Sequence, residues 1–268
     1  MHIIMPIMYP NRCDNEAFLS ETIDLTNVDK YLEAKNAANP EYKYKFFQFM
    51  VAAMLKVLTL RPKMNRFIAN MKLYQRNEVN AAFTIKKEFK DESDEALAII
   101  NAKPSDTFDS IHDEIYRQVS AGRSEKKDTA TDAMDSVNKL PGFLIQLVGV
   151  GARFLDKHGW MPKDVAESDP YQHSMVISNL GSIHLHAGYH HLTNWGTTSV
   201  FVVVGEIKKR HLENEDGTTR YVNSVDITLT VDERIADGYY YARSVSLLRK
   251  LMECPELLDQ SLDTPVEY

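Results

Sequence analysis

The sequence predicts an α/β protein in which helices cover a mixed β-sheet. Helical and extended patterns alternate irregularly along the chain, which favours a mixed sheet over a repeating barrel of strand–helix units. Three segments of the last third are rich in β-branched residues, as expected for central strands. With 268 residues, 44% of them hydrophobic, the chain can bury a substantial core, and we expect a single domain over residues 1–268.

The first half of the chain predicts strands and helices in turn. Residues 19–25 alternate apolar and polar side chains, which is typical of a strand with one buried face. A short helix should follow at 26–36 with a polar cap, and residues 44–60, apolar almost all round, predict a deeply buried helix. Further extended segments are expected at 72–75, 77–89 and 97–100, and a helix at 105–122.

The middle of the chain predicts an inserted helical unit. A charged connection leads into two helical patterns at 130–140 and 143–157, which are separated by Pro141 and Gly142. We therefore expect a helical insertion over residues 124–164.

The last third predicts the centre of the sheet. Strands are expected at 174–178, 198–210 and 220–231, followed by a final helix at 239–253. In the third strand Val225, Ile227, Leu229 and Val231 should share one face, and the intervening Asp and Thr residues should share the other.

Composition excludes several classes of function. The formal charge of −7 leaves no basic excess for nucleic acid, and no local basic patch replaces it. The longest apolar run, residues 143–155, falls well short of the roughly 20 residues that span a bilayer, so no membrane segment is expected. Two cysteines cannot form a disulfide framework, and residues 1–10 lack the features of a signal peptide, which together indicate a cytoplasmic protein.

Two motifs in the last third stand out together. Residues 178–181 read Ser-Asn-Leu-Gly at the end of a predicted strand, and residues 232–238 read Asp-Glu-Arg-Ile-Ala-Asp-Gly before the last helix. An Ala-Arg pair at 242–243 and Cys-Pro-Glu-Leu-Leu at 254–258 follow. These residues resemble the catalytic domain of the 2-oxo acid dehydrogenase dihydrolipoyl acyltransferases and, more distantly, chloramphenicol acetyltransferase.

The resemblance implies an architecture and a co-substrate. It implies the mixed, helix-flanked sheet of the CoA-dependent acyltransferases, arranged as homotrimers that can build a cubic core. Coenzyme A, as acyl-CoA, and a small-molecule acceptor would enter a channel between subunits from opposite ends, with no metal ion. No lipoyl or peripheral-subunit-binding domain is found in the sequence, so we expect a stand-alone version of the fold, with the insertion capping the channel or extending a subunit contact.

The resemblance also implies roles for individual residues. Ser178 would donate a hydrogen bond to the oxyanion of the tetrahedral intermediate. Asp237 would pair with an arginine near the N-terminus, for which Arg12 is the expected partner. Within the same two motifs, the resemblance assigns Asn179 and Gly181 to cofactor binding and Asp232, Arg234 and Gly238 to the scaffold of the site.

Glu233 departs from the family pattern, which is Asp-His-Arg-x-x-Asp-Gly with the histidine as general base. An ordinary Glu has a pKa of about 4.3 and an ordinary His one of about 6.5, so the change costs about 3 kcal/mol in taking a proton from a thiol. Burial would recover part of this loss. Glu233 is therefore a retuned base, a binding residue, or the mark of a fold that has lost acyl transfer.

A histidine cluster offers a competing chemistry. His184, His186, His190 and His191 lie within eight residues, and a His-x-His pair on a strand would place two imidazoles on one face. No Asp, Glu or Cys lies among them, so packing is the leading interpretation, ahead of a substitute catalytic histidine (His190 or His191) and of a metal site.

Two functions therefore stay open, and a third is less favoured. The first is an acyltransferase that uses Glu233 or a nearby histidine as base. The second is a non-catalytic assembly protein, or one that binds acyl groups or coenzyme A. The third is a metal enzyme built on the histidine cluster.

Overall fold

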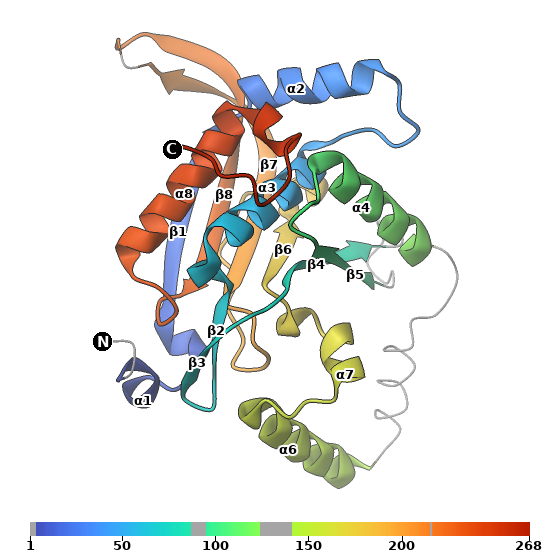
Figure 1. The fold of residues 1–268 in the computed structure, drawn as a ribbon, viewed down its shortest axis with the longest axis vertical. Helices are drawn as coiled ribbons and strands as arrows, with labels where there is room; N and C mark the ends of the chain where they lie inside the picture. Colours follow the sequence, from blue (N-terminus) through green and yellow to red (C-terminus); the bar gives the residue numbers. More distant parts are fainter. Residues whose placement is uncertain (1–3, 87–94, 124–140, 215) are drawn as a thin grey trace.

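A computed structural model describes residues 4–86, 95–123, 141–214 and 216–268. Its main feature is a six-stranded mixed sheet in the order β1-β8-β7-β6-β4-β5 (Figure 1). β4, β6 and β7 run parallel to one another, whereas the pairs β1–β8, β7–β8 and β4–β5 are antiparallel. The strands are β1 (Glu16–Asp24), β4 (Val79–Lys86), β5 (Glu95–Ala102), β6 (Met175–Asn179), β7 (Val200–Glu213) and β8 (Thr219–Asp232).

Four helices cover one face of this sheet (Figure 1). They are α2 (Thr26–Ala37), α3 (Phe46–Leu60), α4 (Phe108–Arg123) and α8 (Gly238–Glu253). The predicted class, a mixed sheet flanked by helices, is confirmed. The predicted strands and helices of the described ranges are present with ends shifted by a few residues, and the helix expected at 130–140 lies outside those ranges.

The principal core lies between the sheet and these helices. Val225, Ile227, Leu229 and Val231 of β8 point into it, while the alternate residues of the strand face the other way, as the period-2 pattern predicts. α3 is buried over nearly its whole surface, so the prediction of a central apolar helix is also confirmed.

The opposite face of the sheet has a smaller apolar cluster. Ala82, Val176, Leu192, Phe201 and Val203 form it. Leu192 comes from the segment 184–196, which follows the 3-10 turn η4 (Leu180–Ile183). This segment contains no strand or helix and lies over this face of the sheet. Near the sheet edge Phe18 is 48% exposed and packs edge-on against Tyr189. This face is therefore only partly covered within one chain.

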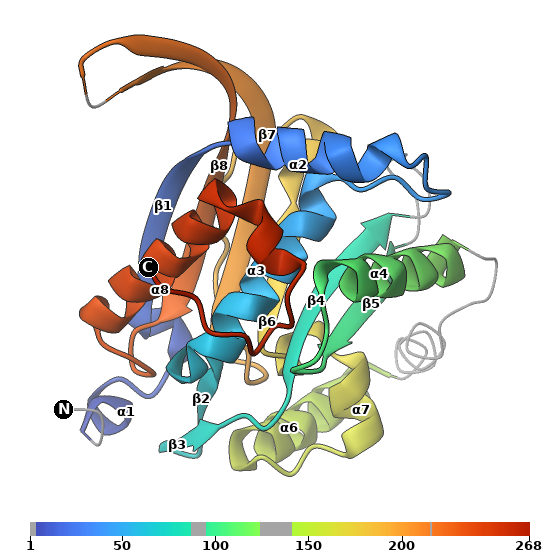
Figure 2. The ribbon, with the colours of Figure 1, turned by 45° about the horizontal axis from the view of Figure 1, so that its top comes forward.

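The distal halves of β7 and β8 leave the body of the molecule as a long curved hairpin (Figure 2). A separate two-stranded sheet, β2 (Arg66–Ala69) with β3 (Lys72–Gln75), extends from the other end. No helix among residues 4–86, 95–123, 141–214 and 216–268 is both long and apolar enough to cross a membrane.

The described part of the predicted insertion is α6 (Gly142–His158), followed by the short helix α7 (Lys163–Ser168). No residue of α6 is buried. Phe143, Leu147, Val150 and Phe154 are 70%, 67%, 67% and 53% exposed, and their spacing of four, three and four residues places them on one side of the helix. α6 therefore presents an apolar stripe that the described residues, 4–86, 95–123, 141–214 and 216–268, leave exposed.

Candidate functional site

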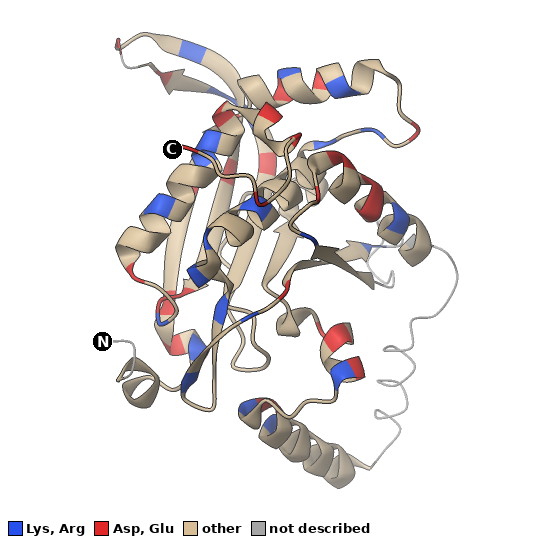
Figure 3. Ribbon diagram, viewed as in Figure 1, with Lys and Arg blue, Asp and Glu red and all other residues tan. Residues whose placement is uncertain are grey.

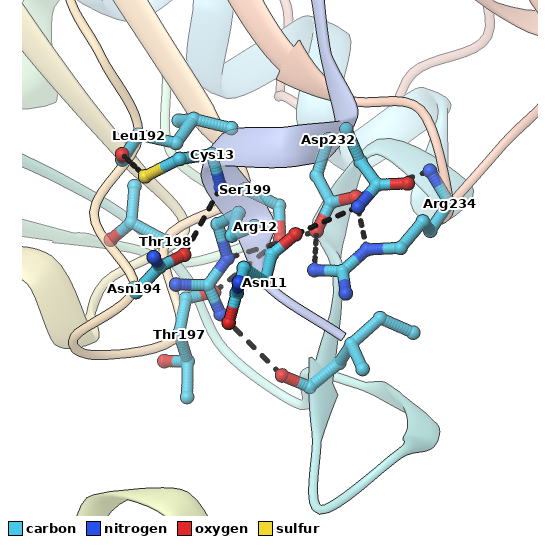
Figure 4. Close-up of polar contacts among 12 residues, drawn as sticks. Asn11, Arg12, Cys13, Leu192, Asn194, Thr197, Thr198, Ser199, Asp232 and Arg234 are labelled. Carbon is cyan, nitrogen blue, oxygen red and sulfur yellow. Dashed lines mark hydrogen bonds and ion pairs between the residues drawn. The ribbon is translucent and has the colours of Figure 1, made fainter. Parts of the chain in front are cut away.

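A buried ion pair holds the turn after β8. The carboxylate of Asp232 accepts hydrogen bonds from Nε and Nη2 of Arg234 at 2.8 and 2.7 Å, and from the Arg234 backbone N–H (Figure 4). Both side chains are at most 1% exposed. Arg234 also donates to the carbonyls of Tyr9 and Pro10, and Tyr241 donates to the Asp232 carbonyl. These hydrogen bonds connect the N-terminal segment to the turn after β8.

Arg12 joins this pair, which corrects one expectation. Its Nε lies 3.7 Å from Oδ2 of Asp232, so its carboxylate partner is Asp232 and the predicted pairing with Asp237 is wrong. The register explains the change, because Glu16 faces Asp232 across β1 and β8 and brings the preceding turn η1 (Arg12–Asn15) beside the base of β8. Nη1 of Arg12 donates to the Thr193 carbonyl at 2.7 Å.

Glu233 lies between the buried residues Asp232 and Arg234 in the sequence, but its own side chain is exposed. It lies in the turn that follows β8, where its side chain lines a cavity of about 610 Å³. Most of the cavity wall is apolar and comes from β1 and α8, including Leu19, Tyr241 and Val245. The ion pair between Glu21 and Arg249 closes one side, with nitrogen–oxygen distances of 2.8 Å.

Asp237 and Gly238 lie at the start of α8 and line the same cavity. Asp237 is the N-cap residue, and its Oδ1 accepts a hydrogen bond from the backbone N–H of Tyr240 at 2.9 Å. Gly238 begins the helix in open space, with no atom within 4 Å of a hypothetical Cβ. The motif therefore combines one buried ion pair, one exposed carboxylate and one helix cap within seven residues.

Ser178 and Asn179 lie at the far end of the sheet from Glu233. Ser178 pairs with Val203 of β7, which in turn pairs with Thr228 of β8. Glu233 is five residues beyond Thr228, which corresponds to roughly 17 Å along the strand direction. A single chain therefore does not bring Ser178 and Glu233 to one reacting atom.

The turn after Ser178 depends on close backbone packing. A Cβ on Gly181 would lie 2.5 Å from the carbonyl oxygen of Gly205, and one on Gly205 would lie 2.5 Å from the backbone nitrogen of Ala187. These two glycines allow the segment 180–187 to lie directly on β7, where the β7–β8 register shifts between Val204 and Ile207. The steric role of Gly181 is visible without any ligand.

Replacing Gly181 by alanine is expected to destabilise the protein by about 1–3 kcal/mol, because the added methyl group meets backbone that cannot rotate away. Urea unfolding measures the loss. Gly188→Ala in the same segment is the matched control, since no atom lies within 4 Å of its Cβ position. Equal effects of the two substitutions would show that the Gly205 contact is unimportant.

The histidine cluster does not form the expected strand pair. His184 ends a 3-10 turn in the left-handed conformation with φ of 59°, and residues 184–191 are not in a strand, so the His-x-His geometry is absent. The ring of His190 stacks on Phe201 with centroids 3.9 Å apart. Within the described ranges no group of three His, Cys, Asp or Glu side chains is arranged to hold a metal ion.

Two residues at the site were missed by sequence reasoning. The Glu16 carboxylate, 5% exposed, lies 3.3 Å from Nδ1 of His191 and accepts the backbone N–H of Leu192 at 2.5 Å. The neighbouring Asn15 carbonyl accepts the backbone N–H of Glu233 at 2.9 Å. His191 is therefore oriented by a buried carboxylate on the strand next to the Asp232 turn, a contact over 175 residues that no local pattern signals.

The fold and the stretch that contains these two turns are similar to known proteins. The architecture is that of the chloramphenicol acetyltransferase-like acyltransferases, and residues 162–259, which contain both motifs, match the family model "2-oxoacid dehydrogenases acyltransferase (catalytic domain)". A comparison with curated proteins found no match. α6 lies outside the matched residues.

Solved structures similar to this chain have low sequence identity. A probable dihydrolipoamide acetyltransferase from Listeria monocytogenes has 15% identity and a TM-score of 0.64, over 100% of this chain and 92% of its own. Dihydrolipoamide acetyltransferase of Azotobacter vinelandii has 15% identity and a TM-score of 0.63, over 95% and 90%. Chloramphenicol acetyltransferase has 12% identity and a TM-score of 0.59, over 94% and 93%.

Proposed function

We propose that this protein binds an acyl-CoA at a site shared by two neighbouring subunits of a homotrimer, and that replacement of the general-base histidine by Glu233 has suppressed acyl transfer to thiols. The observation that carries the proposal is the preserved turn around Glu233. The buried Asp232–Arg234 pair and the Asp237 cap are intact, while the side chain between them is an exposed carboxylate that lines a cavity.

The distance between the two motifs supports a shared site. Ser178 and Glu233 lie at opposite ends of the sheet, so a neighbouring chain has to supply the Ser178 that faces Glu233. The partly covered sheet face around Ser178 and the apolar stripe on α6 are surfaces that such a contact would bury. The three outer-facing positions Leu147, Val150 and Phe154 have the spacing of residues that pack between helices.

A structure of the Azotobacter vinelandii enzyme addresses the role of a serine, a histidine and an asparagine in its catalytic mechanism. In that protein the asparagine follows the histidine by four residues, as Asp237 follows Glu233 here. On this correspondence Ser178 is the oxyanion donor, Glu233 occupies the position of the base, and Asp237 fixes the start of α8 beside it.

The Glu233 carboxylate is poorly suited to the histidine's task. It remains in contact with water in the single chain, and a carboxylate holds a thiol proton less strongly than imidazole does. The cavity next to it is nevertheless large enough and apolar enough to receive the pantetheine arm and acyl group of an acyl-CoA. Binding is therefore retained on this proposal, and the proton-transfer step is impaired.

A second candidate is acyl transfer with His191 as a substitute base. The favouring observation is the buried Glu16 carboxylate at Nδ1 of His191, an arrangement that fixes the ring and leaves Nε2 to accept a proton. His191→Gln separates the two candidates, because it removes wild-type turnover only if this histidine is the base.

Light scattering is expected to show a trimer, and it also reports any further assembly. Isothermal titration should give one acetyl-CoA per chain, with affinity falling at least about tenfold in Ala242→Trp, because the indole fills the cavity beside Glu233. Tyr239→Trp, at a residue that is 78% exposed on the same helix and outside the cavity lining, is the control. The proposal would be contradicted by a monomer in light scattering, or by an acetyl-CoA affinity that is unchanged in Ala242→Trp.

A further inference from the structure

A second cavity of about 660 Å³ lies apart from the one beside Glu233. Its walls come from the C-terminal part of α6, the tip of the β2–β3 hairpin and residues 193–196 before β7. The charged residues of α6 gather at the end of the helix that approaches this hairpin (Figure 3). α6 lies outside the residues that match the acyltransferase family model, whereas residues 193–196 of the cavity wall lie within them.

The floor of the cavity carries two buried arginines. Arg12 and Arg234, 4% and 1% exposed, both contact the carboxylate of Asp232. Burial lowers the pKa of Arg12, although Asp232 opposes the shift. The pKa of Arg76 is lowered to about 10, mainly by burial and further by Arg12. Both Arg12 and Arg234 line the cavity, so an anion bound there would meet two guanidinium groups.

Arg12 still has donor capacity at this point. Its Nη1 donates to the carbonyls of Thr193 and Trp195, and its Nη2 to that of Ile68 at 3.4 Å. Its Nε has no hydrogen-bond partner in the part of the chain that the structure describes. A buried guanidinium that lines the cavity is suited to bind an oxyanion there.

The rim adds two more cations from α6. Arg153 and Lys157 are exposed and line the cavity. Asp156, between them on the same turn, accepts hydrogen bonds from the Gly196 backbone N–H at 3.1 Å and from the Gln172 side chain at 2.8 Å. Its carboxylate is thus engaged in holding α6 to the body of the protein. Four cations and one carboxylate, Asp156, line the cavity, in a chain whose formal charge is −7.

We propose that this cavity binds a small organic anion, with a carboxylate or phosphate group between Arg12 and the α6 cations. The volume exceeds what one oxyanion fills, and Ile68, Met71 and Trp195 supply apolar surface for the rest of the ligand. The inference does not depend on acyl transfer, because the cavity is lined by different residues from the one that holds Glu233.

The test is titration calorimetry on the full chain at constant ionic strength, with inorganic phosphate, succinate and coenzyme A as separate probes. Saturable binding of one ligand per chain is expected, and the three probes distinguish a phosphate from a carboxylate and from a nucleotide. Arg153→Gln should weaken binding by about tenfold, since it removes one charge-assisted contact. Asp156→Asn should tighten binding severalfold, because it removes the opposing charge and keeps an oxygen for Gly196 or Gln172.

A gain of affinity in Asp156→Asn cannot arise from misfolding, so the pair of variants controls for damage to α6. Lys163→Gln, on α7 outside the cavity lining, should leave binding unchanged. Absence of saturable binding for all three probes overturns the proposal. An affinity that is the same in the wild type, Arg153→Gln and Asp156→Asn also overturns it. Coenzyme A binding that responds to Ala242→Trp and not to Arg153→Gln would assign that ligand to the Glu233 cavity alone.

Discussion

Asp232→Asn is expected to lower the free energy of unfolding by about 3–5 kcal/mol. The substitution preserves the size of the side chain but removes the carboxylate charge that both buried guanidinium groups contact. Arg12 and Arg234, at no more than 4% exposure, would then lose the negative charge that Asp232 supplies to both of them. The N-terminal segment that Arg234 holds through the Tyr9 and Pro10 carbonyls should loosen at the same time.

Urea unfolding measures this loss, and the chain contains a matched control. Asp226 also accepts two hydrogen bonds from one arginine, Arg210, at 2.6 and 2.5 Å, but these side chains are 26% and 29% exposed. Asp226→Asn should therefore cost no more than about 1 kcal/mol. If the two substitutions cost the same, burial is not what makes the Asp232 cluster important. Hydrogen exchange at residues 4–16 would show whether the N-terminal segment loosens.

The arrangement of this cluster shows where sequence reasoning stops. Alternation in β8 and the apolar surface of α3 depend on residues close together in the chain, and both could be predicted. The partners of Asp232 depend on strand order, because β1 and β8 are adjacent in the sheet but about 200 residues apart in sequence. The resemblance pointed to Arg12 as a partner of a motif acid, but only the register shows which acid it meets.

The same limit applies to the rest of the candidate site. The motif residues at 178–181 and 232–238 could be recognised, but their positions at opposite ends of the sheet follow from β7 lying antiparallel between them. Glu16 and Asn15 carry no local signal, and their contacts with His191 and Glu233 exist only in the folded chain. The exposed stripe on α6 has the apolar spacing of a packed helix, so its exposure was not predictable from that pattern.

Glu233→His is expected to raise the rate of acyl transfer from acetyl-CoA to dihydrolipoamide by roughly 100-fold, within the range that a positioned general base contributes. The scaffold that would orient the new imidazole is already present in the Asp232–Arg234 pair and the Asp237 cap. The substitution breaks no side-chain hydrogen bond of Glu233 to another residue of the described ranges, and its backbone bond to Asn15 is unaffected. Chromatographic separation of coenzyme A from acetyl-CoA follows the reaction, because transfer between two thiols leaves the total number of thiols unchanged.

The pH profile and three further variants make the interpretation specific. An imidazole base must be neutral to act, so the gained activity should rise with pH through about 6.5 and level off above it. Glu233→Gln, which has no base, should gain nothing. Adding Ser178→Ala to Glu233→His should remove most of the gain if Ser178 of a neighbouring subunit stabilises the oxyanion. Fast wild-type turnover that is abolished by Glu233→Gln would instead make Glu233 the working base. Wild-type turnover that is lost in His191→Gln alone would assign that role to His191, the histidine that Glu16 contacts.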